Sequence, residues 1–248
     1  MGNINLKDIS TRAGKEFDKK ETKNKTEKIL EELNDLQNLL FAENKHSILI
    51  IIQGMDASGK DGVIRNVFTA MNPQGVIVKS FKAPTAEELS HDFLWRIHLH
   101  APAKGMIQIF NRSHYEDILI TRVHKWCDDA TARKRMKAIN DWEQLLSQHN
   151  NTHILKFYLH VSPEEQQERL SERIKDPSKM WKYNENDFEE AKLWDIYMQA
   201  YEDCFENCNI IPWTIVPSDQ NWYKEFIIAS ALRDTLADLK MQYPGLKK

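Results

Sequence analysis

Short apolar runs recur along the chain and predict the strands of a sheet that is buried on both faces. The run at 48–52 is almost entirely isoleucine, as is typical of a strand inside a parallel sheet. The other runs lie at 75–81, 106–110, 153–161 and 210–216. They alternate with helical patterns, expected at 15–44, from 63, 85–100, 131–148, from 163, 187–207 and 221–242. We therefore predict an α/β fold, a parallel sheet flanked by helices.

The pattern before the first strand predicts an arm followed by a long helix. Residues 1–14 lack periodicity and are expected to form a tail or an arm lying on another surface. One apolar stripe, which includes Ile29, Leu33 and Leu40, runs along the helix. It must pack on the sheet or on a second subunit, and the pattern does not choose. We therefore divide the chain into 1–45, an N-terminal arm and helix, and 46–248, a domain with a helical lid at about 170–190.

A glycine-rich stretch at 54–62 follows the first strand and precedes a helix. Strand, glycine loop and helix are the context of a phosphate-binding loop, because backbone N–H groups and the helix N-terminus face an anion there. Lys60 adds a positive charge for phosphate oxygens. The alternative is a turn without a ligand. The other candidate binding residues of the stretch are Gly54, Met55, Ala57, Ser58, Gly59 and Gly62.

Two carboxylates accompany this loop. Asp56 lies inside it, and Asp61 stands where nucleotide triphosphatases place a Ser or Thr that holds magnesium. Carboxylates beside a phosphate site repel the phosphate unless a divalent cation lies between them. We therefore predict a Mg²⁺-dependent phosphoryl-transfer site in which Asp56 and Asp61 are the metal ligands.

Polar residues after the strand at 106–110 form a second candidate site. Asn111, Arg112, Glu116 and Asp117 follow its carboxyl end, where open α/β sheets bind ligands. Arg112 can bind phosphate oxygens through two parallel hydrogen bonds. The acids can hold magnesium or orient a nucleotide; alternatively they are first-turn acids favoured by a helix dipole.

Basic residues elsewhere supply further candidates. Lys82 and Arg96 are candidate anion contacts or ordinary surface charges. A cationic segment from Arg169 to Lys182, which includes Arg173, is a solvated loop or a mobile lid that lowers positive charge onto phosphates. Its candidate binding residues are Lys175, Lys179 and Lys182.

The composition of the chain argues against several classes of protein. The chain has 248 residues, three cysteines and a formal net charge of −3. The cysteine count predicts no disulfide framework and favours the cytoplasm. The net charge argues against general nucleic-acid binding, and no apolar stretch is long enough to span a membrane.

Six motifs in order make the chain resemble the polyphosphate kinase 2 family, from about residue 28 to 243. They are GMDASGKDG at 54–62, SFKAP at 80–84, HDFLWR at 91–96, FNRSHYED at 110–117, DPSKMWK at 176–182 and PWTIVPSD at 212–219. The resemblance implies a P-loop kinase fold close to thymidylate kinases, with inorganic polyphosphate as donor and AMP and ADP as acceptors.

The resemblance also implies roles for individual residues. Asp56, Lys60 and Asp61 belong to the phosphate and magnesium site, and Arg112 and Arg173 bind phosphate. The motif NRSHYED at 111–117, where other members have DRSWY, resembles the subgroup that phosphorylates both nucleoside mono- and diphosphates. In this motif Asn111 replaces an Asp. It leaves more of the metal role to Asp56 and Asp61. A dimer or tetramer is expected.

Two other functions fit the same fold. An ATP-dependent nucleoside monophosphate kinase predicts turnover with ATP and AMP, but the missing Ser or Thr after Lys60 counts against it. A non-catalytic nucleotide-binding switch predicts binding without transfer, and the basic lid segment argues for chemistry instead.

Overall fold

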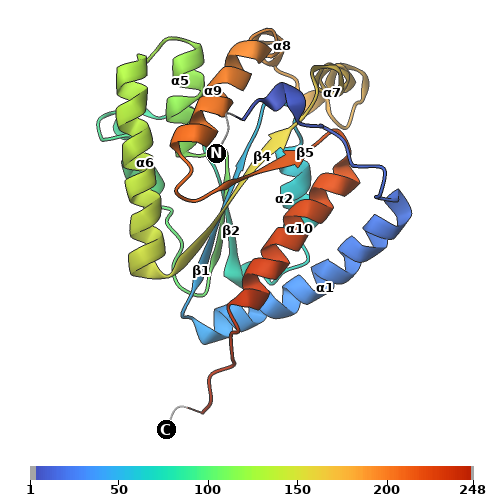
Figure 1. Ribbon diagram of the computed structural model, residues 1–248, viewed down its shortest axis with the longest axis vertical. Coiled ribbons are helices and arrows are strands. Elements are labelled where there is room, and N and C mark those ends of the chain that lie inside the picture. The colour runs from blue at the N-terminus through green and yellow to red at the C-terminus, as the bar shows by residue number, and fades with distance from the viewer. Residues whose placement is uncertain (1–3, 247–248) are drawn as a thin grey trace.

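A single sheet of five parallel strands organises the molecule, with helices on both faces (Figure 1). The computed structural model describes residues 4–246. The strand order is β2-β3-β1-β4-β5, which confirms the predicted α/β class. The strands are β1 (Ser47–Gln53), β2 (Val76–Ser80), β3 (Ile107–Asn111), β4 (Thr152–His160) and β5 (Trp213–Pro217).

The helices form two layers around the sheet. α1, α2 and α10 lie on one face, whereas α5, α6 and α9 lie on the other (Figure 1). The helices are α1 (Lys19–Glu43), α2 (Lys60–Phe68), α3 (Ala86–Leu89), α4 (Trp95–His98), α5 (Ile120–Val123), α6 (Asp129–Asn150), α7 (Pro163–Lys175), α8 (Asn186–Ala191), α9 (Trp194–Asn207) and α10 (Asn221–Asp238). Short 3-10 turns cover Leu6–Asp8, Pro73–Gly75, His114–Ile118 and Met180–Lys182.

Strand β1 lies at the centre of the sheet and is buried along its whole length. Successive side chains of a strand point to opposite faces. Leu49 and Ile51 therefore enter the core under α6 and α9, while Ile48, Ile50 and Ile52 enter the core under α1 and α10. This double burial explains why the sequence of β1 is nearly continuous in isoleucine.

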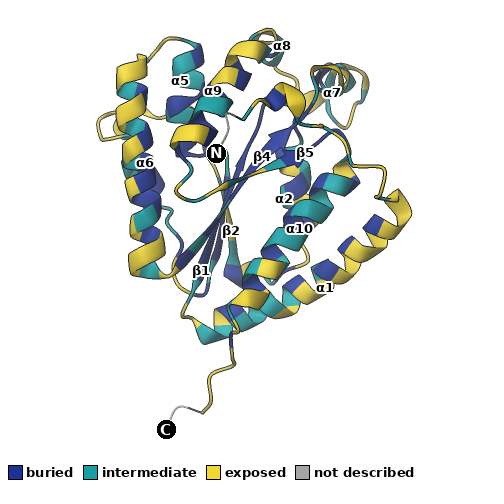
Figure 2. Cartoon of the chain, viewed as in Figure 1, coloured by how far each residue is buried: buried dark blue, intermediate teal, exposed yellow. Residues whose placement is uncertain are grey.

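Helix α1 packs against α10 of the same chain. Ile29, Leu33 and Leu40 are buried in one cluster with Ile228 and Leu232 of α10. Figure 2 shows the buried stripe of α1 turned toward α10, with exposed positions on its outer side. The stripe, whose partner the pattern left open, is thus covered within the protomer by the last helix.

The N-terminal arm lies on the protein's own surface. Leu6 is buried in the core, and its backbone N–H donates to Glu202 of α9 at 2.8 Å. Further along, Thr11 Oγ1 donates to Asp219 at 2.8 Å, and Ala13 N donates to the Gln220 side chain at 2.9 Å. The arm is thereby joined to the loop after β5. The part of this prediction that concerns residues 1–3 lies outside the described residues.

The helix expected at 85–100 is wrong in its length, although its start is confirmed. Thr85 and Glu88 form the predicted capping box. Ser90 Oγ then donates to the carbonyl of Glu87, and Asp92 accepts from the backbone of Leu94. These side chains compete with the helical backbone, so the segment forms the two short helices α3 and α4.

The helix expected at 187–207 is also divided. Lys192 N donates to Glu189 O and Leu193 N donates to Glu190 O, which is the tighter 3-10 pattern. α8 therefore ends at Ala191 and α9 begins at Trp194. Among residues 4–246, none of the helices combines the length and the apolar composition that crossing a bilayer requires.

The sheet brings the two polar segments together. β1 and β3 are neighbouring parallel strands in which Ile52 pairs with Asn111. The carboxyl ends of β1 and β3 therefore lie next to each other. As a result, the stretch 54–59, which follows β1, lies beside residues 111–112 at the end of β3. The backbone N–H of Arg112 donates to Ile52 O at 3.1 Å, which fixes this adjacency.

Candidate active site

The stretch between β1 and α2 has the backbone of an anion-binding loop. Gly54, Ala57 and Gly59 have φ values of 153°, 61° and 98°, a region that side chains other than glycine rarely adopt. A Cβ at Gly54 would lie 2.9 Å from Leu159 O, so no larger residue fits there. No side chain caps α2. Its first N–H groups therefore have no side-chain acceptor and are suited to an anion.

Lys60 lies under this loop as the first residue of α2. Its ammonium group donates to Gly54 O at 2.7 Å and to Met55 O at 3.0 Å. Burial lowers the pKa of Lys60 to about 8, with a further contribution from Arg112. The side chain thus stabilises the loop and holds a positive charge beside it.

Arg112 follows β3 with a positive φ of 61°. Its guanidinium pairs with Asp56 and, at 3.3 Å, with Glu116. Burial opposes the charged form of Arg112, but Glu116 and Asp56 raise its pKa. Burial likewise opposes the charge of Asp56, and Arg112 and Lys60 lower its pKa in spite of that. Asp56 and Arg112 therefore form an ionised pair.

Asp61 connects three elements. Its Oδ1 accepts from the Asn111 amide at 2.9 Å, and its Oδ2 accepts from Lys182 at 3.0 Å. Burial raises the pKa of Asp61, but the hydrogen bonds from Lys182 and Asn111 lower it overall. The segment around Lys182 thereby contacts α2 and the end of β3 through one carboxylate.

Basic residues between positions 173 and 182 have carboxylate partners within the protein. Arg173 pairs with Asp187 and also donates to the carbonyl of Lys182 at 3.3 Å. Lys179 lies 2.5 Å from Glu172. Each of these basic groups therefore has a protein acid as its partner, which a phosphate group can replace.

These elements enclose a cavity of about 800 Å³. Nine basic side chains line it against three acidic ones, although the whole chain has a net charge of −3. The basic residues are Lys60, Arg65, Lys82, Arg112, Arg169, Arg173, Lys179, Lys182 and Lys224. Such a concentration of positive charge suits a ligand with several phosphates.

The comparison with protein families agrees with this geometry. Residues 16–244 match the family model of Polyphosphate kinase 2 (PPK2). The chain belongs to the polyphosphate kinase 2 family. The match covers every element from the arm's end to α10, so the family assignment rests on the whole sheet and not on the phosphate loop alone.

Relatives of the PPK2 family resemble the chain over most of its length. An AMP/ADP-polyphosphate phosphotransferase of Meiothermus ruber is 46% identical over 214 residues, which cover 86% of this chain and 80% of that protein. An ADP-polyphosphate phosphotransferase of Rhodopseudomonas palustris is 45% identical over 229 residues, covering 87% and 79%. The crystal structure of Polyphosphate Kinase 2 from Arthrobacter aurescens TC1 superimposes with a TM-score of 0.96 at 41% identity, covering 100% of this chain and 90% of that one.

Several predicted site residues of this PPK2 chain do not line the cavity. Arg96 is buried, donates to Lys82 O at 2.9 Å and lies 3.7 Å from Asp117. Asp117 therefore faces Arg96, and burial raises its pKa. Glu116 contacts Arg112 instead and orients it. The remaining predicted residues absent from the cavity wall are Gly54, Met55, Ser58 and Lys175.

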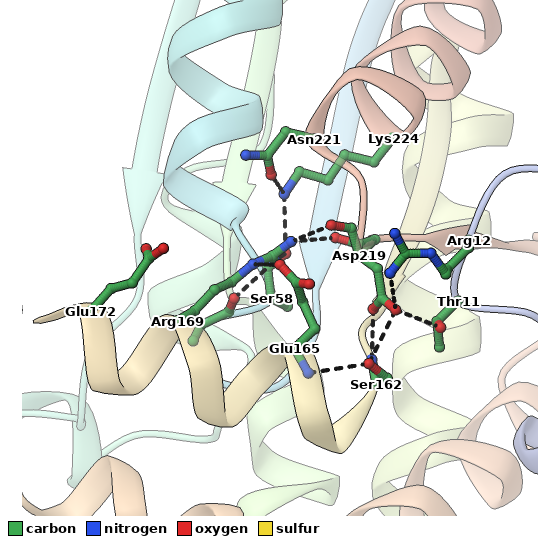
Figure 3. A network of polar contacts seen from close by, with 12 residues as sticks. Thr11, Arg12, Ser58, Ser162, Glu165, Arg169, Glu172, Asp219, Asn221 and Lys224 are labelled. Carbon is green, nitrogen blue, oxygen red and sulfur yellow. Dashed lines mark hydrogen bonds and ion pairs between the residues drawn. The ribbon is translucent and has the colours of Figure 1, made fainter. Parts of the chain in front are cut away.

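Two basic residues have roles that the sequence does not assign to them: it predicts Arg169 only among the cations of the segment 169–182, and it does not single out Lys224. Arg169 of α7 supports the phosphate loop from behind (Figure 3). Its acceptors are the Glu165 carboxylate and the carbonyl oxygens of Ala57, Ser58, Ser218 and Asp219. Lys224 of α10 reaches the same loop. Because each is a basic residue within a helix and outside any motif, its sequence context does not distinguish it from a surface charge.

The acidic residues of the cavity suit a magnesium ion. Asp56 and Asp61 both line it, and both carboxylates are ionised. Among residues 4–246 no group of three or more His, Cys, Asp and Glu side chains is placed to hold a metal. Mg²⁺ bound to phosphates commonly takes only one or two carboxylates and completes its shell with water and phosphate oxygens. The two aspartates fit this arrangement.

Proposed function

We propose that this PPK2 chain catalyses Mg²⁺-dependent phosphoryl transfer from inorganic polyphosphate to AMP and ADP, producing ADP and ATP. The observation that carries the proposal is the strongly basic cavity at the carboxyl ends of β1 and β3. The names of the relatives, which include phosphotransferases acting on AMP and on ADP, support the choice of donor and acceptors.

Phosphoryl transfer requires the protein mainly to align the two reactants and to neutralise their charge. An oxygen of the nucleotide's terminal phosphate attacks the terminal phosphorus of polyphosphate, and the bond from that phosphorus to the next bridging oxygen breaks. The attacking oxygen is ionised at neutral pH, so no general base is required. One phosphoanhydride replaces another, and the reaction is therefore expected to be reversible.

The residues of the cavity have separate tasks in this transfer. Lys60 and the N-terminus of α2 hold donor phosphates. Arg112 and Arg173 exchange their carboxylate partners for the oxygens of the transferred group. Asp56 and Asp61 hold Mg²⁺, which neutralises phosphate charge when bound. Lid closure over the cavity excludes water, which would otherwise accept the phosphoryl group.

The proposal extends to assembly and compartment. All three cysteines are free, two of them buried, which is consistent with a cytoplasmic protein. β2 is an edge strand of the sheet and exposes Ile77 and Val78, and we place the contact of the expected dimer or tetramer at this edge.

The first test measures nucleotide production from AMP, and separately from ADP, with long-chain polyphosphate and Mg²⁺ and without ATP. We expect ADP and ATP from AMP, and ATP from ADP. Activity with one acceptor alone would keep the donor and remove the dual-acceptor assignment. Turnover that requires ATP in place of polyphosphate would support an ordinary nucleoside monophosphate kinase, and tight binding without product would support a switch.

A further inference from the structure

Lys224 is a buried lysine of α10 whose ammonium group reaches the phosphate loop. The residue is 1% exposed, yet it forms part of the cavity wall. Its Nζ donates to Ser58 O at 3.2 Å and to the Asn221 side chain, one turn earlier in the helix, at 2.7 Å. Figure 3 shows Lys224 and Asn221 extending from α10 toward the turn that leads into α2.

The loop is shaped to admit this ammonium group. A Cβ at Gly59 would lie 2.0 Å from Lys224 Nζ, so the absence of a side chain at Gly59 makes room for it. Lys60 and Lys224 thus approach the same loop, one from its own helix and one from the last helix of the chain. Each donates two hydrogen bonds to neutral oxygens.

The number of hydrogen-bond donors distinguishes Lys224 from its neighbour Arg169. An ammonium group has three N–H donors, and within the described chain Lys224 uses two of them. Arg169 has five donors, each directed at an oxygen of the protein. All five donors of Arg169 are therefore occupied by the protein itself, whereas Lys224 retains one donor at the wall of the cavity.

The charge of Lys224 is also incompletely balanced. Within residues 4–246 no carboxylate oxygen lies in ion-pair contact with it, unlike Arg112, Arg173 and Lys182. Burial and the positive charge of Arg169 lower the pKa of Lys224 to about 7, while Glu225 and Glu165 oppose that shift and Lys60 adds to it. A buried cation without an acid partner is costly, and an anion in the cavity would supply one.

We propose that Lys224 is a second phosphate-binding lysine of the cavity and that it holds the polyphosphate donor. This assignment rests on the proposed function. The immediate partners of its ammonium group are a carbonyl, an amide and the backbone of Gly59. A chain of phosphates needs only polar and cationic contacts of this kind, whereas a nucleotide also requires a surface for its base.

The experiment compares Lys224→Met and Lys224→Arg with Lys25→Met, which removes a charge from the exposed side of α1. We expect Lys224→Met to raise the KM for polyphosphate about tenfold, the usual scale for one charged hydrogen bond. The KM for AMP should change less than about twofold, and Lys25→Met should match the wild type. Because an Arg side chain keeps the charge, Lys224→Arg should restore most of the affinity.

Two further measurements keep the proposal open to refutation. Calorimetric titration with inorganic tripolyphosphate, without nucleotide, reports phosphate binding even if the wild type has no turnover, which would refute the proposed function alone. If Lys224→Met does not fold, Lys224→Arg decides, because arginine stays charged at all accessible pH values. Its kcat/KM for polyphosphate should decline at a higher pH than that of the wild type.

The proposal is overturned by any of three results. They are a folded Lys224→Met protein with unchanged tripolyphosphate affinity, an increase confined to the KM for AMP, and identical pH profiles for the wild type and Lys224→Arg.

Discussion

Lys182 Nζ lies 3.0 Å from Asp61 Oδ2, and this ion pair joins the 3-10 turn Met180–Lys182 to the first turn of α2. The carboxylate of Asp61 is 62% exposed, and the lysine side chain is 34% exposed. The pair is therefore accessible to competing ions. In the proposed function Asp61 would hold Mg²⁺ and Lys182 would bind a phosphate oxygen, so ligand binding would separate this pair and is coupled to the position of the segment around Lys182.

Replacing Lys182 by alanine tests this coupling. We expect kcat/KM for polyphosphate to fall by about tenfold or more because a charged contact to phosphate is lost. The melting temperature should change little, since a partly exposed ion pair contributes roughly 0–1 kcal/mol. Steady-state kinetics and thermal unfolding measure the two effects. Unchanged kinetics would exclude Lys182 from the site.

Lys60 is expected to be far more important for turnover. Lys60→Ala removes a buried charge beside the loop, and loss of a comparable preorganised donor reduces kcat by about 10²–10³ in other enzymes. Asp56→Asn, which removes a proposed metal ligand while keeping the side-chain shape, should also reduce the rate strongly. The check is the initial rate of ADP formation from AMP. A wild-type rate in either variant would contradict the assignment.

Asn111→Asp should make stability depend on magnesium. The Asn111 amide donates to Asp61 at 2.9 Å, so an aspartate there would place two carboxylates side by side. Like charges repel, and a divalent cation relieves the repulsion. We expect the variant to melt about 2–4 °C below the wild type without metal, as for a loss of about 1 kcal/mol. Added Mg²⁺ should raise its melting temperature more than that of the wild type. Equal increases would contradict the prediction.

Mild acid should destabilise the fold through buried histidines. Burial lowers the pKa of His114 and of His160 below the ordinary 6.5, although Glu143, 3.5 Å from His114 Nε2, opposes the shift for His114. The unfolded chain therefore takes up protons near pH 6.5 that the folded chain does not bind. Stability should be fully present above that pH and fall as the pH decreases.

The pH dependence has an expected size. Each buried histidine that stays neutral contributes a slope of up to about 1.4 kcal/mol per pH unit. Thermal unfolding between pH 7.5 and 5.5 measures it. A melting temperature that stays constant over this range would show that these histidines take up protons in the folded state.

The framework of the site could be predicted because local signals specify it. Local patterns predict that Lys60 and Arg112 lie together at the carboxyl ends of the strands, as the structure confirms. These patterns are the isoleucine run of β1, the glycines that follow it and the apolar run of β3. Nothing local marks the supporting residues. Lys224 reaches Ser58 across 166 positions of sequence, and no motif surrounds it in α10.

The orientation of individual side chains was equally inaccessible. Asp117 and Glu116 are adjacent in sequence, yet one faces Arg96 and the other faces Arg112. The 3-10 turn at His114–Ile118 points the two side chains in different directions, and no periodic pattern in the sequence predicts such a turn. Likewise, the break between α3 and α4 and the break between α8 and α9 each depend on a few individual hydrogen bonds. The apolar stripes of the sequence do not predict these bonds.

The packing of α1 against α10 has a consequence for synthesis on the ribosome. The first long helix to emerge keeps its apolar stripe uncovered until the last helix has left the exit tunnel, because Leu33 and Leu40 are buried with Ile228 and Leu232. The loop beside Ser58 likewise lacks its contact with Lys224 until α10 has been synthesised. A nascent chain that stops before residue 221 is therefore expected to be prone to aggregation and to be inactive. The apolar stripe of α1 and the loop beside Ser58 are therefore completed together, when α10 packs onto the sheet.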